Sequence, residues 1–325
     1  MILPRRKFLH LAAGAALAPS LARRAAAADA YPSRPIHLIV GFTPGAAADV
    51  AARLLSQGAG PILGQQLVVE NRPGAGSSIA AEYVARAAQD GYTVNLATLS
   101  IITNQIINPN RSFDLTRNLT AVALLESQAV VLVANPASSI HSVADLINFA
   151  KTHPGDVLHA TVIGAMPHFA SEMFAQRAGI KLTQVPYQGS PQAIADVVAG
   201  RALIMFCPAS TVVGLIAAGK VRALATAAKK RPSALPDVPT VEEAGIADFD
   251  TSLWFGLMAP AGTPRHAIDK LAAASHTAMH LPTALETLRK QGYEPLDAGP
   301  DDFAVFIRSE ISRWSSVASA AGLKS

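Results

Sequence analysis

The chain has 325 residues, of which 50% are hydrophobic and only 15% are charged. At about 150 residues per domain this length predicts two domains, and the apolar content excludes disorder as the main state. The formal net charge of +4 arises in the first 28 residues, which hold five bases and no acid, whereas the rest of the chain carries 22 bases and 23 acids. The folded part therefore lacks the basic excess that nucleic-acid binding requires.

The first 30 residues have the layout of an export signal. A basic start at residues 5–7 precedes an apolar stretch over residues 8–22, and Ala-x-Ala cleavage choices end near Ala28 or Ala30. The arginine pair fits the twin-arginine pattern, and an ordinary secretory leader is the alternative. Both predict a mature protein in the periplasm, and no later run of about 18 apolar residues predicts a membrane span.

The only cysteine is Cys207, far from the leader. An internal disulfide is therefore excluded, and a lipid anchor at the mature N-terminus is not expected. As a nucleophile Cys207 would need a basic partner, and none is evident in the sequence around it. A small apolar residue after a buried strand is the interpretation that we favour.

From residue 31 onward, short β-branched or Leu-rich runs alternate with Ala-rich stretches of helical period. This alternation is typical of βαβ units and of largely parallel sheets. Strands are expected over residues 36–40, 66–70, 93–97, 129–134, 157–162, 182–185, 203–206, 222–226 and 253–258. Helices are expected between them, notably over residues 47–57, 78–88, 143–151, 168–177, 191–199 and 211–217.

The chain after Pro260 changes character. Three further helices are expected there, over residues 264–280, 282–291 and 300–321, each opened by a proline suited to a first helical turn. No strand is expected between them.

Two long runs, residues 121–134 and 250–258, could each cross between two lobes. We therefore expect residues 31–128 and 251–325 to form lobe 1 and residues 129–250 to form lobe 2. Two crossings imply a pair of hinges, and proteins of this kind close around a small molecule held between the lobes.

The most informative segment is the first expected strand, which runs into a Gly/Pro turn at residues 41–45 and then into a helix. Small residues let a ligand approach the backbone there, and the free N–H groups of a first helical turn attract an anion such as a carboxylate. The spacing matches neither Gly-x-Gly-x-x-Gly nor a phosphate-binding loop that ends in Gly-Lys-Ser/Thr. A plain strand-to-helix turn, with Asp49 as a first-turn carboxylate, is the alternative.

The same strand-turn-helix arrangement recurs at residues 70–78, 162–168 and 186–191. In a parallel sheet these turns share the edge at the carboxyl ends of the strands, where open α/β folds bind ligands. We therefore expect several helix N-termini to face one cleft.

Several ordered segments carry a resemblance to a known family. They are Tyr31-Pro32-x-Arg34-Pro35, Val69-Glu70-Asn71-Arg72-Pro73-Gly74-Ala75-Gly76, Asp90-Gly91-Tyr92, and residues 185–190, 234–245 and 254–264. Together they resemble the Bug family, the periplasmic substrate-binding proteins of tripartite tricarboxylate transporters. The resemblance spans essentially the whole chain after the leader.

This resemblance implies an α/β, two-lobed periplasmic-binding-protein fold of type II, each lobe a mostly parallel sheet flanked by helices. It further implies a monomer that closes on a small carboxylic acid, without cofactor or metal, and delivers it to membrane transporter subunits. A receptor that presents its ligand to a sensor kinase is the alternative, and an exported hydrolase is a weaker one. The sequence has no Gly-x-Ser-x-Gly, no His-Glu-x-x-His and no cysteine pair, so an enzyme is not expected.

The site residues that the resemblance implies lie in loops at strand ends. In lobe 1 they are Phe42, Thr43, Gly45, Ala46, Ala47, Ala48, Asp49, Asn71 and Thr98, and in lobe 2 they are Gly164, Ala165, Met166, His168, Gln188, Gly189 and Cys207.

Three departures from the family pattern affect this site. Ala46 and Ala47 stand where the family usually has glycines, so backbone contacts require φ to stay negative there. The segment Ala165-Met166-Pro167 and Cys207 replace residues that are often polar in the family. Because an unmatched buried polar group costs about 1–3 kcal/mol, an apolar site predicts a ligand with an apolar or aromatic body.

His276 and His280 are four residues apart on an expected helix, a spacing that can hold zinc. No third ligand is evident nearby in the sequence, so a solvated helix end is the favoured interpretation. His168 and Glu172 have the same spacing and favour a first-turn histidine beside the cleft. Trp254 and Phe255 are expected in the core near the second crossing.

Overall fold

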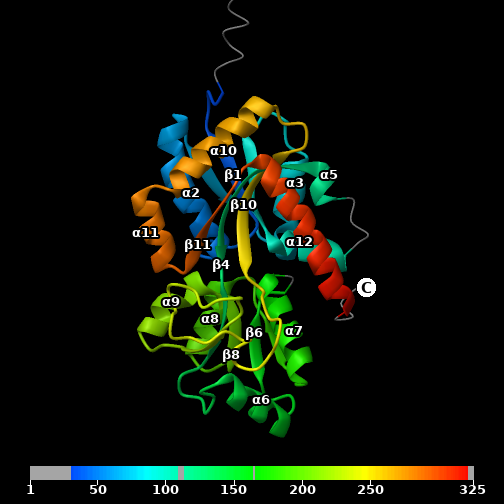
Figure 1. Ribbon diagram of the computed structural model, residues 1–325, viewed down its shortest axis with the longest axis vertical. Helices are drawn as coiled ribbons and strands as arrows, with labels where there is room; N and C mark the ends of the chain where they lie inside the picture. Colours follow the sequence, from blue (N-terminus) through cyan, green and yellow to red (C-terminus); the bar gives the residue numbers. More distant parts are fainter. Residues whose placement is uncertain (1–30, 109–112, 164, 321–325) are drawn as a thin grey trace, which may run out of the picture.

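The computed structural model describes residues 31–108, 113–163 and 165–320. Two lobes lie one above the other along the long axis, each built on one sheet (Figure 1). The expected leader, residues 1–30, lies outside the described residues. Among the helices of the described ranges, none is long and apolar enough to cross a membrane.

The sheet of lobe 1 has the order β11-β4-β10-β3-β1-β2. Its strands are β1 (Ile36–Val40), β2 (Leu67–Asn71), β3 (Thr93–Thr98), β4 (Leu119–Gln128), β10 (Leu253–Pro260) and β11 (Tyr293–Ala298). Parallel pairing joins β1 to β2 and β3, whereas β10 and β11 pair antiparallel with their neighbours. The helices of this lobe are α2 (Ala47–Leu63), the 3-10 turn η1 (Ala75–Ser77), α3 (Ser78–Ala85), α4 (Leu99–Ile107), α5 (Leu115–Asn118), α10 (Arg265–Met279), α11 (Pro282–Lys290) and α12 (Pro300–Ala320).

The sheet of lobe 2 has the order β7-β6-β8-β5-β9. Its strands are β5 (Val130–Ala134), β6 (Leu158–Thr161), β7 (Thr183–Pro186), β8 (Ile204–Pro208) and β9 (Arg222–Thr226), and its helices are α6 (Val143–Thr152), α7 (Met166–Ala178), α8 (Ser190–Val198) and α9 (Ala209–Ala217). Strand β5 pairs antiparallel with β8 and β9, whereas β6 pairs parallel with β7 and β8. The expected two-lobed α/β fold is thus confirmed, with sheets that are mixed because the crossing strands add antiparallel pairs.

The chain passes twice between the sheets, from β4 to β5 and from β9 to β10. The run over residues 121–134 is not one strand: it divides at Ala129 into β4 and β5, which belong to different sheets. Beside the second passage, Arg313 of α12 donates a hydrogen bond of 2.9 Å to the carbonyl of Asp250. The indole N–H groups of Trp254 and Trp314 both reach Oε2 of Glu310, at 3.1 and 3.2 Å. The last helix therefore fixes the chain where it re-enters lobe 1.

The expectation that no strand separates the three last helices is wrong. Strand β11 lies between α11 and α12 and pairs with β4, with Tyr293 opposite Gln128. Proline and charged residues are tolerated on an edge strand, and β11 contains Pro295 and two acidic residues. This composition hides the strand from a search for alternating apolar residues.

Helix α2 extends six residues beyond its expected end, to Leu63. Gly58, Gly60 and Pro61 suggest an earlier stop, but a Cβ atom at Gly58 would lie 2.8 Å from Cβ of Ala278 in α10. The glycine thus permits close packing of the two helices rather than ending one. The helix ends at Gly64, which has φ of 69° and so takes the left-handed conformation that glycine favours.

Glu126 of β4 is fully buried, and within the described residues neither of its carboxylate oxygens has a hydrogen-bond partner. It stands opposite Phe255 on one side and Pro295 on the other. Burial raises the pKa of Glu126 from 4.5 to about 8. Between pH 4.5 and about 8, Glu126 is therefore protonated in the folded protein and ionised in the unfolded chain.

We predict that Glu126→Gln makes stability less dependent on pH. As the pH rises from 4.5 toward 8, the wild type loses up to about 1.4 kcal/mol of unfolding free energy per pH unit from this group, and the neutral amide does not. Urea unfolding at several pH values measures the difference between the two proteins. The exposed Glu242→Gln is the control. A Glu126→Gln effect equal at every pH would contradict the prediction.

Candidate functional site

Helix starts from both lobes meet at a small cavity of about 30 Å³, here called the inner cavity. Its lining consists of Phe42, Ala46, Ala47, Ala48, Thr98, Ser100, Val162, Ala165, Pro167, Ser190, Pro208, Leu253 and Phe255. Within the described part of the chain, five helices begin at this cavity: α2, α4, α7, α8 and α9. The expectation that several helix N-termini face one cleft is therefore confirmed.

These five helix starts lack side-chain caps. The N-cap residues are Ala46, Thr98, Ala165, Gly189 and Pro208, and none accepts a hydrogen bond through its side chain within the described residues. First-turn N–H groups that have no acceptor remain donors for a ligand or for water. Helix α7 is the exception, because its Met166 N–H donates to Oγ of Ser100, Pro167 has no N–H, and the His168 N–H donates to the carbonyl of Ala165. The partial positive charge of the helix starts favours an anion in the inner cavity.

Most other groups around the inner cavity are apolar. Phe42, Val162, Leu253 and Phe255 supply aliphatic and aromatic surface, and prolines supply more. The exceptions are the hydroxyl groups of Thr98, Ser100 and Ser190. Ser100 Oγ accepts from Met166, whereas the buried Oγ1 of Thr98 has no hydrogen-bond partner among the described residues. A largely apolar wall with few hydroxyls is a good environment for a ligand with few polar groups.

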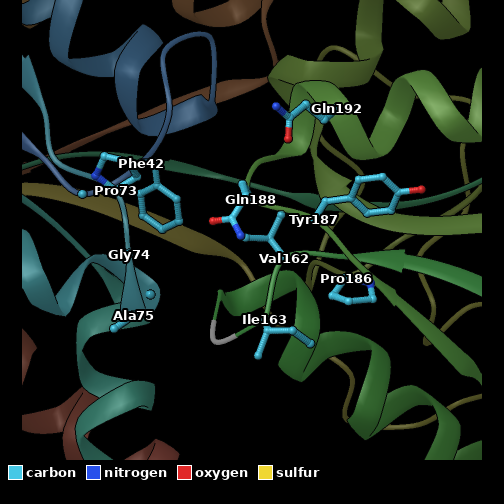
Figure 2. Close-up of a pocket in the computed structure, with 12 residues that line it drawn as sticks. Phe42, Pro73, Gly74, Ala75, Val162, Ile163, Pro186, Tyr187, Gln188 and Gln192 are labelled. Carbon is cyan, nitrogen blue, oxygen red and sulfur yellow. The ribbon is translucent and has the colours of Figure 1, made fainter.

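A larger, more open cavity of about 410 Å³, the outer cavity, lies beside the inner one and shares Phe42 and Val162 with it. Lobe 1 contributes the segment 73–76, and lobe 2 contributes residues 186–188 and Gln192. Figure 2 shows the Gln188 side chain pointing toward Phe42 from the opposite lobe, while the Tyr187 ring points away. The Tyr187 hydroxyl instead donates to Asp196, at 2.5 Å.

Asp49 supports the first loop from behind and does not line either cavity. Its carboxylate accepts hydrogen bonds from the Gly45 N–H at 2.9 Å and from Asn71 Nδ2 at 2.9 Å, and it forms a two-point pair with Arg53. Asn71 also donates to the carbonyl of Phe42. Burial opposes ionisation of Asp49, but the hydrogen bonds from Arg53, Gly45 and Asn71 outweigh it and keep the pKa below its usual value.

The two lobes touch at the cleft. The backbone N–H of Met166 donates to Oγ of Ser100 across the lobes, at 3.0 Å. A Cβ atom at Gly189 would lie 2.2 Å from Oγ1 of Thr43, so only glycine allows this approach. The structure therefore shows the lobes in a closed arrangement.

The remaining expected site residues lie elsewhere or are not described. Cys207 is fully buried in a core of lobe 2, its Sγ 3.6 Å from the carbonyl of Val131, and burial raises the pKa of its thiol. Side chains alternate along a strand, so the next residue, Pro208, lines the cavity instead. His168 lines neither cavity; burial lowers its pKa, and Glu172 and Gln184 oppose that shift. Gly164 lies outside the described residues.

The sequence interpretation missed several lining residues. Ser100 belongs to α4, which follows β3 with no turn residue, so its apolar and β-branched sequence gave no helix signal. Leu253 and Phe255 are two residues apart, so their side chains lie on the same face of β10. This two-residue spacing was the sequence signal that both could face the cleft. Trp254, on the other face, lies in the core as expected.

A family model described as the tripartite tricarboxylate transporter family receptor matches residues 51–323. The chain belongs to this family. The solved structure of the periplasmic binding protein BugD is similar, with 29% identity, a TM-score of 0.87, and coverage of 90% of this chain and 99% of that one.

Two similar structures from Rhodopseudomonas palustris hold carboxylates. Rpa4515, solved with adipate, is 32% identical, with a TM-score of 0.86 and coverage of 90% and 98% of the two chains. MatC, solved with malate, is 30% identical, with a TM-score of 0.84 and coverage of 88% and 99%. The family is thus one of solute receptors, and some of its members bind small carboxylates.

Asp49→Ala is predicted to lower the free energy of unfolding by about 2–3 kcal/mol, because it removes a buried, charged acceptor of hydrogen bonds from Gly45, Asn71 and Arg53. Urea denaturation measures the loss. Asp269→Ala is the matched control: Asp269 pairs with Arg265 four residues away, as Asp49 pairs with Arg53, but both partners are exposed. Its loss should stay below about 1 kcal/mol. Equal losses for the two variants would refute a special role for Asp49.

Proposed function

We propose that this protein is a periplasmic receptor that captures a small carboxylic acid by closure of its lobes and delivers it to the membrane subunits of a tripartite tricarboxylate transporter. The observation that carries this proposal is the meeting of uncapped helix starts from both lobes, those of α2 and α4 with those of α8 and α9, at one interlobe cavity. An anion bound there satisfies N–H groups from both lobes at once. Ligand binding therefore favours the closed state.

The dimensions of the two cavities suggest how a ligand is divided between them. The inner cavity, at about 30 Å³, has room for little more than a carboxylate or a water molecule. The outer cavity, at about 410 Å³, has room for the body of the ligand. We place the carboxylate at the helix starts and the rest of the molecule between Phe42 and Gln188.

The alanines in the first loop are compatible with backbone binding. Ala46 has φ of −72°, and Ala47 opens helix α2, so neither residue needs the left-handed conformation that would demand glycine. The contacts proposed for Ala46, Ala47 and Ala48 are therefore made through the main chain. Asp49 and Asn71 hold this loop in position.

The ligand that we favour has an aliphatic or aromatic body. Most side chains that line the outer cavity are apolar, among them Phe42, Pro73 and Val162, and burying a hydroxyl or ammonium group unpaired against them costs about 1–3 kcal/mol. Adipate in a relative fits this description, because its carboxylates are joined by methylene groups alone. Malate in another relative carries a hydroxyl, for which the outer cavity offers the amides of Gln188 and Gln192.

A thermal-shift and calorimetric screen of carboxylic acids tests the proposal. Adipate, longer aliphatic diacids and aromatic acids should raise the melting temperature, because a ligand that binds only the folded state stabilises it. Amino acids should not. Tight binding of amino acids together with no response to aliphatic or aromatic acids would overturn the ligand assignment. Deletion of the gene should abolish uptake of the identified acid; persistent uptake with lost induction would favour a sensor.

Gly189→Ala is predicted to weaken ligand binding at least tenfold, about 1.4 kcal/mol, because the added Cβ meets Thr43 only when the lobes are closed. Calorimetric titration with the identified acid measures the change. Thr43→Ala in the same chain removes the clashing Oγ1 and should restore part of the affinity. Gly214→Ala, where the added atom meets open space, is the control. Unchanged affinity of Gly189→Ala would show that closure at this contact is not required.

A further inference from the structure

A cluster of metal-ligating side chains lies on lobe 1, outside both cavities. His276 lies in the last turn of α10, His280 is the C-cap residue that follows this helix, and Asp297 lies on β11. One ligand atom from each of the three exposed side chains falls within 4.8 Å of those from the other two. Helix α11 separates them in sequence, and Figure 1 shows α10, α11 and β11 in the upper lobe.

The third ligand is the part that the sequence did not reveal. Asp297 follows His280 by a whole helix and sits on a strand whose composition hides it. The pairing of β11 with β4 brings Asp297 beside α10, with its Oδ1 2.8 Å from Nδ1 of His276. Two histidines on one helix face and a carboxylate from a neighbouring strand form a donor set typical of transition-metal sites.

The hydrogen bonds orient the rings for coordination. Nδ1 of His280 lies 2.8 Å from the carbonyl oxygen of His276. Because a carbonyl can only accept, this nitrogen carries the proton, which leaves Nε2 with a free lone pair. Metal-binding histidines are commonly fixed in this way by a backbone carbonyl. The rings of His276 and His280 lie 4.3 Å apart between centroids and are inclined by 35°, so the two imidazoles lie side by side next to Asp297.

We propose that His276, His280 and Asp297 bind a transition-metal ion of the zinc class, with the remaining coordination position open to water. Two nitrogens and one oxygen suit Zn²⁺, Co²⁺ or Ni²⁺, whereas Mg²⁺ and Ca²⁺ prefer oxygen ligands throughout. Tetrahedral zinc places its ligand atoms about 3.3 Å apart, and exposed side chains can close the remaining gap by small rotations.

Metal binding at this site would join the end of α10 to the edge strand β11. Bound metal stabilises the folded state, because the unfolded chain does not hold the ligands together. None of the three residues lines the inner or outer cavity. A failure to bind metal would therefore not contradict the proposed carboxylate site, and a failure to bind carboxylates would not contradict the metal site.

Titration of the chain, freed of any histidine tag, with ZnCl₂ and with CoCl₂ tests the site. We expect zinc to raise the melting temperature by several degrees, MgCl₂ to have no effect, and Co²⁺ to give the visible absorption of tetrahedral coordination. His280→Ala and Asp297→Asn should each lose both responses. His141→Ala, which removes an exposed histidine of lobe 2, should keep both.

Melting curves without metal give the baseline for each variant, so a general loss of stability is distinguished from a loss of binding. The proposal is overturned if wild type shows no response to zinc or cobalt. It is also overturned if His280→Ala and Asp297→Asn respond as strongly as wild type, because zinc then binds elsewhere.

Discussion

The unpaired N–H groups at helix starts are the constraint on which the binding site depends. A parallel βα unit places the start of its helix at the carboxyl end of its strand, so neighbouring units deliver their helix starts to one sheet edge. Here the edges of two sheets face each other. The N-cap positions carry alanine, glycine, proline and a threonine whose side chain accepts no capping hydrogen bond. Outside α7, first-turn N–H groups that a serine or aspartate cap would satisfy therefore remain available to a ligand.

This arrangement separates the groups that attract an anion from those that hold the loop. Asp49 is a carboxylate in the first turn of α2, where its negative charge could compete with that of a ligand. Its hydrogen bonds to Arg53 and Asn71 turn it away from the cavity and neutralise it locally. The loop gains a rigid support, and the partial positive charge of the helix start stays directed into the cleft.

The sequence predicted those features that follow from local pattern. Strands β1, β3 and β9 are short runs bounded by turns, and the helices expected to begin after Gly/Pro turns at residues 47 and 191 begin at residues 47 and 190. Features that depend on distant pairing escaped prediction. Strand β11 is a strand only because β4 offers it an edge, and Pro295 and its acidic residues give no local sign of it.

Side-chain direction was the other limit of prediction. Cys207 and Pro208 end the same strand, and only the register of β8 against β5 decides which of them faces the cleft. Likewise Phe255 faces the cavity while Trp254 faces α12, although both are aromatic residues of one crossing strand. Pattern alone located these strand ends but did not fix which face each residue occupies.

The hydrogen bond from the Tyr293 hydroxyl to the carbonyl of Ala47, 2.8 Å long, joins positions 246 residues apart. The ligand-facing start of α2 is therefore supported by the edge strand β11, in which Tyr293 lies opposite Gln128 of β4. A one-residue slip of β11 along β4 would turn the Tyr293 side chain to the other face of the sheet and break this contact. The register of an edge strand outside the binding site thus decides whether the first loop keeps its support.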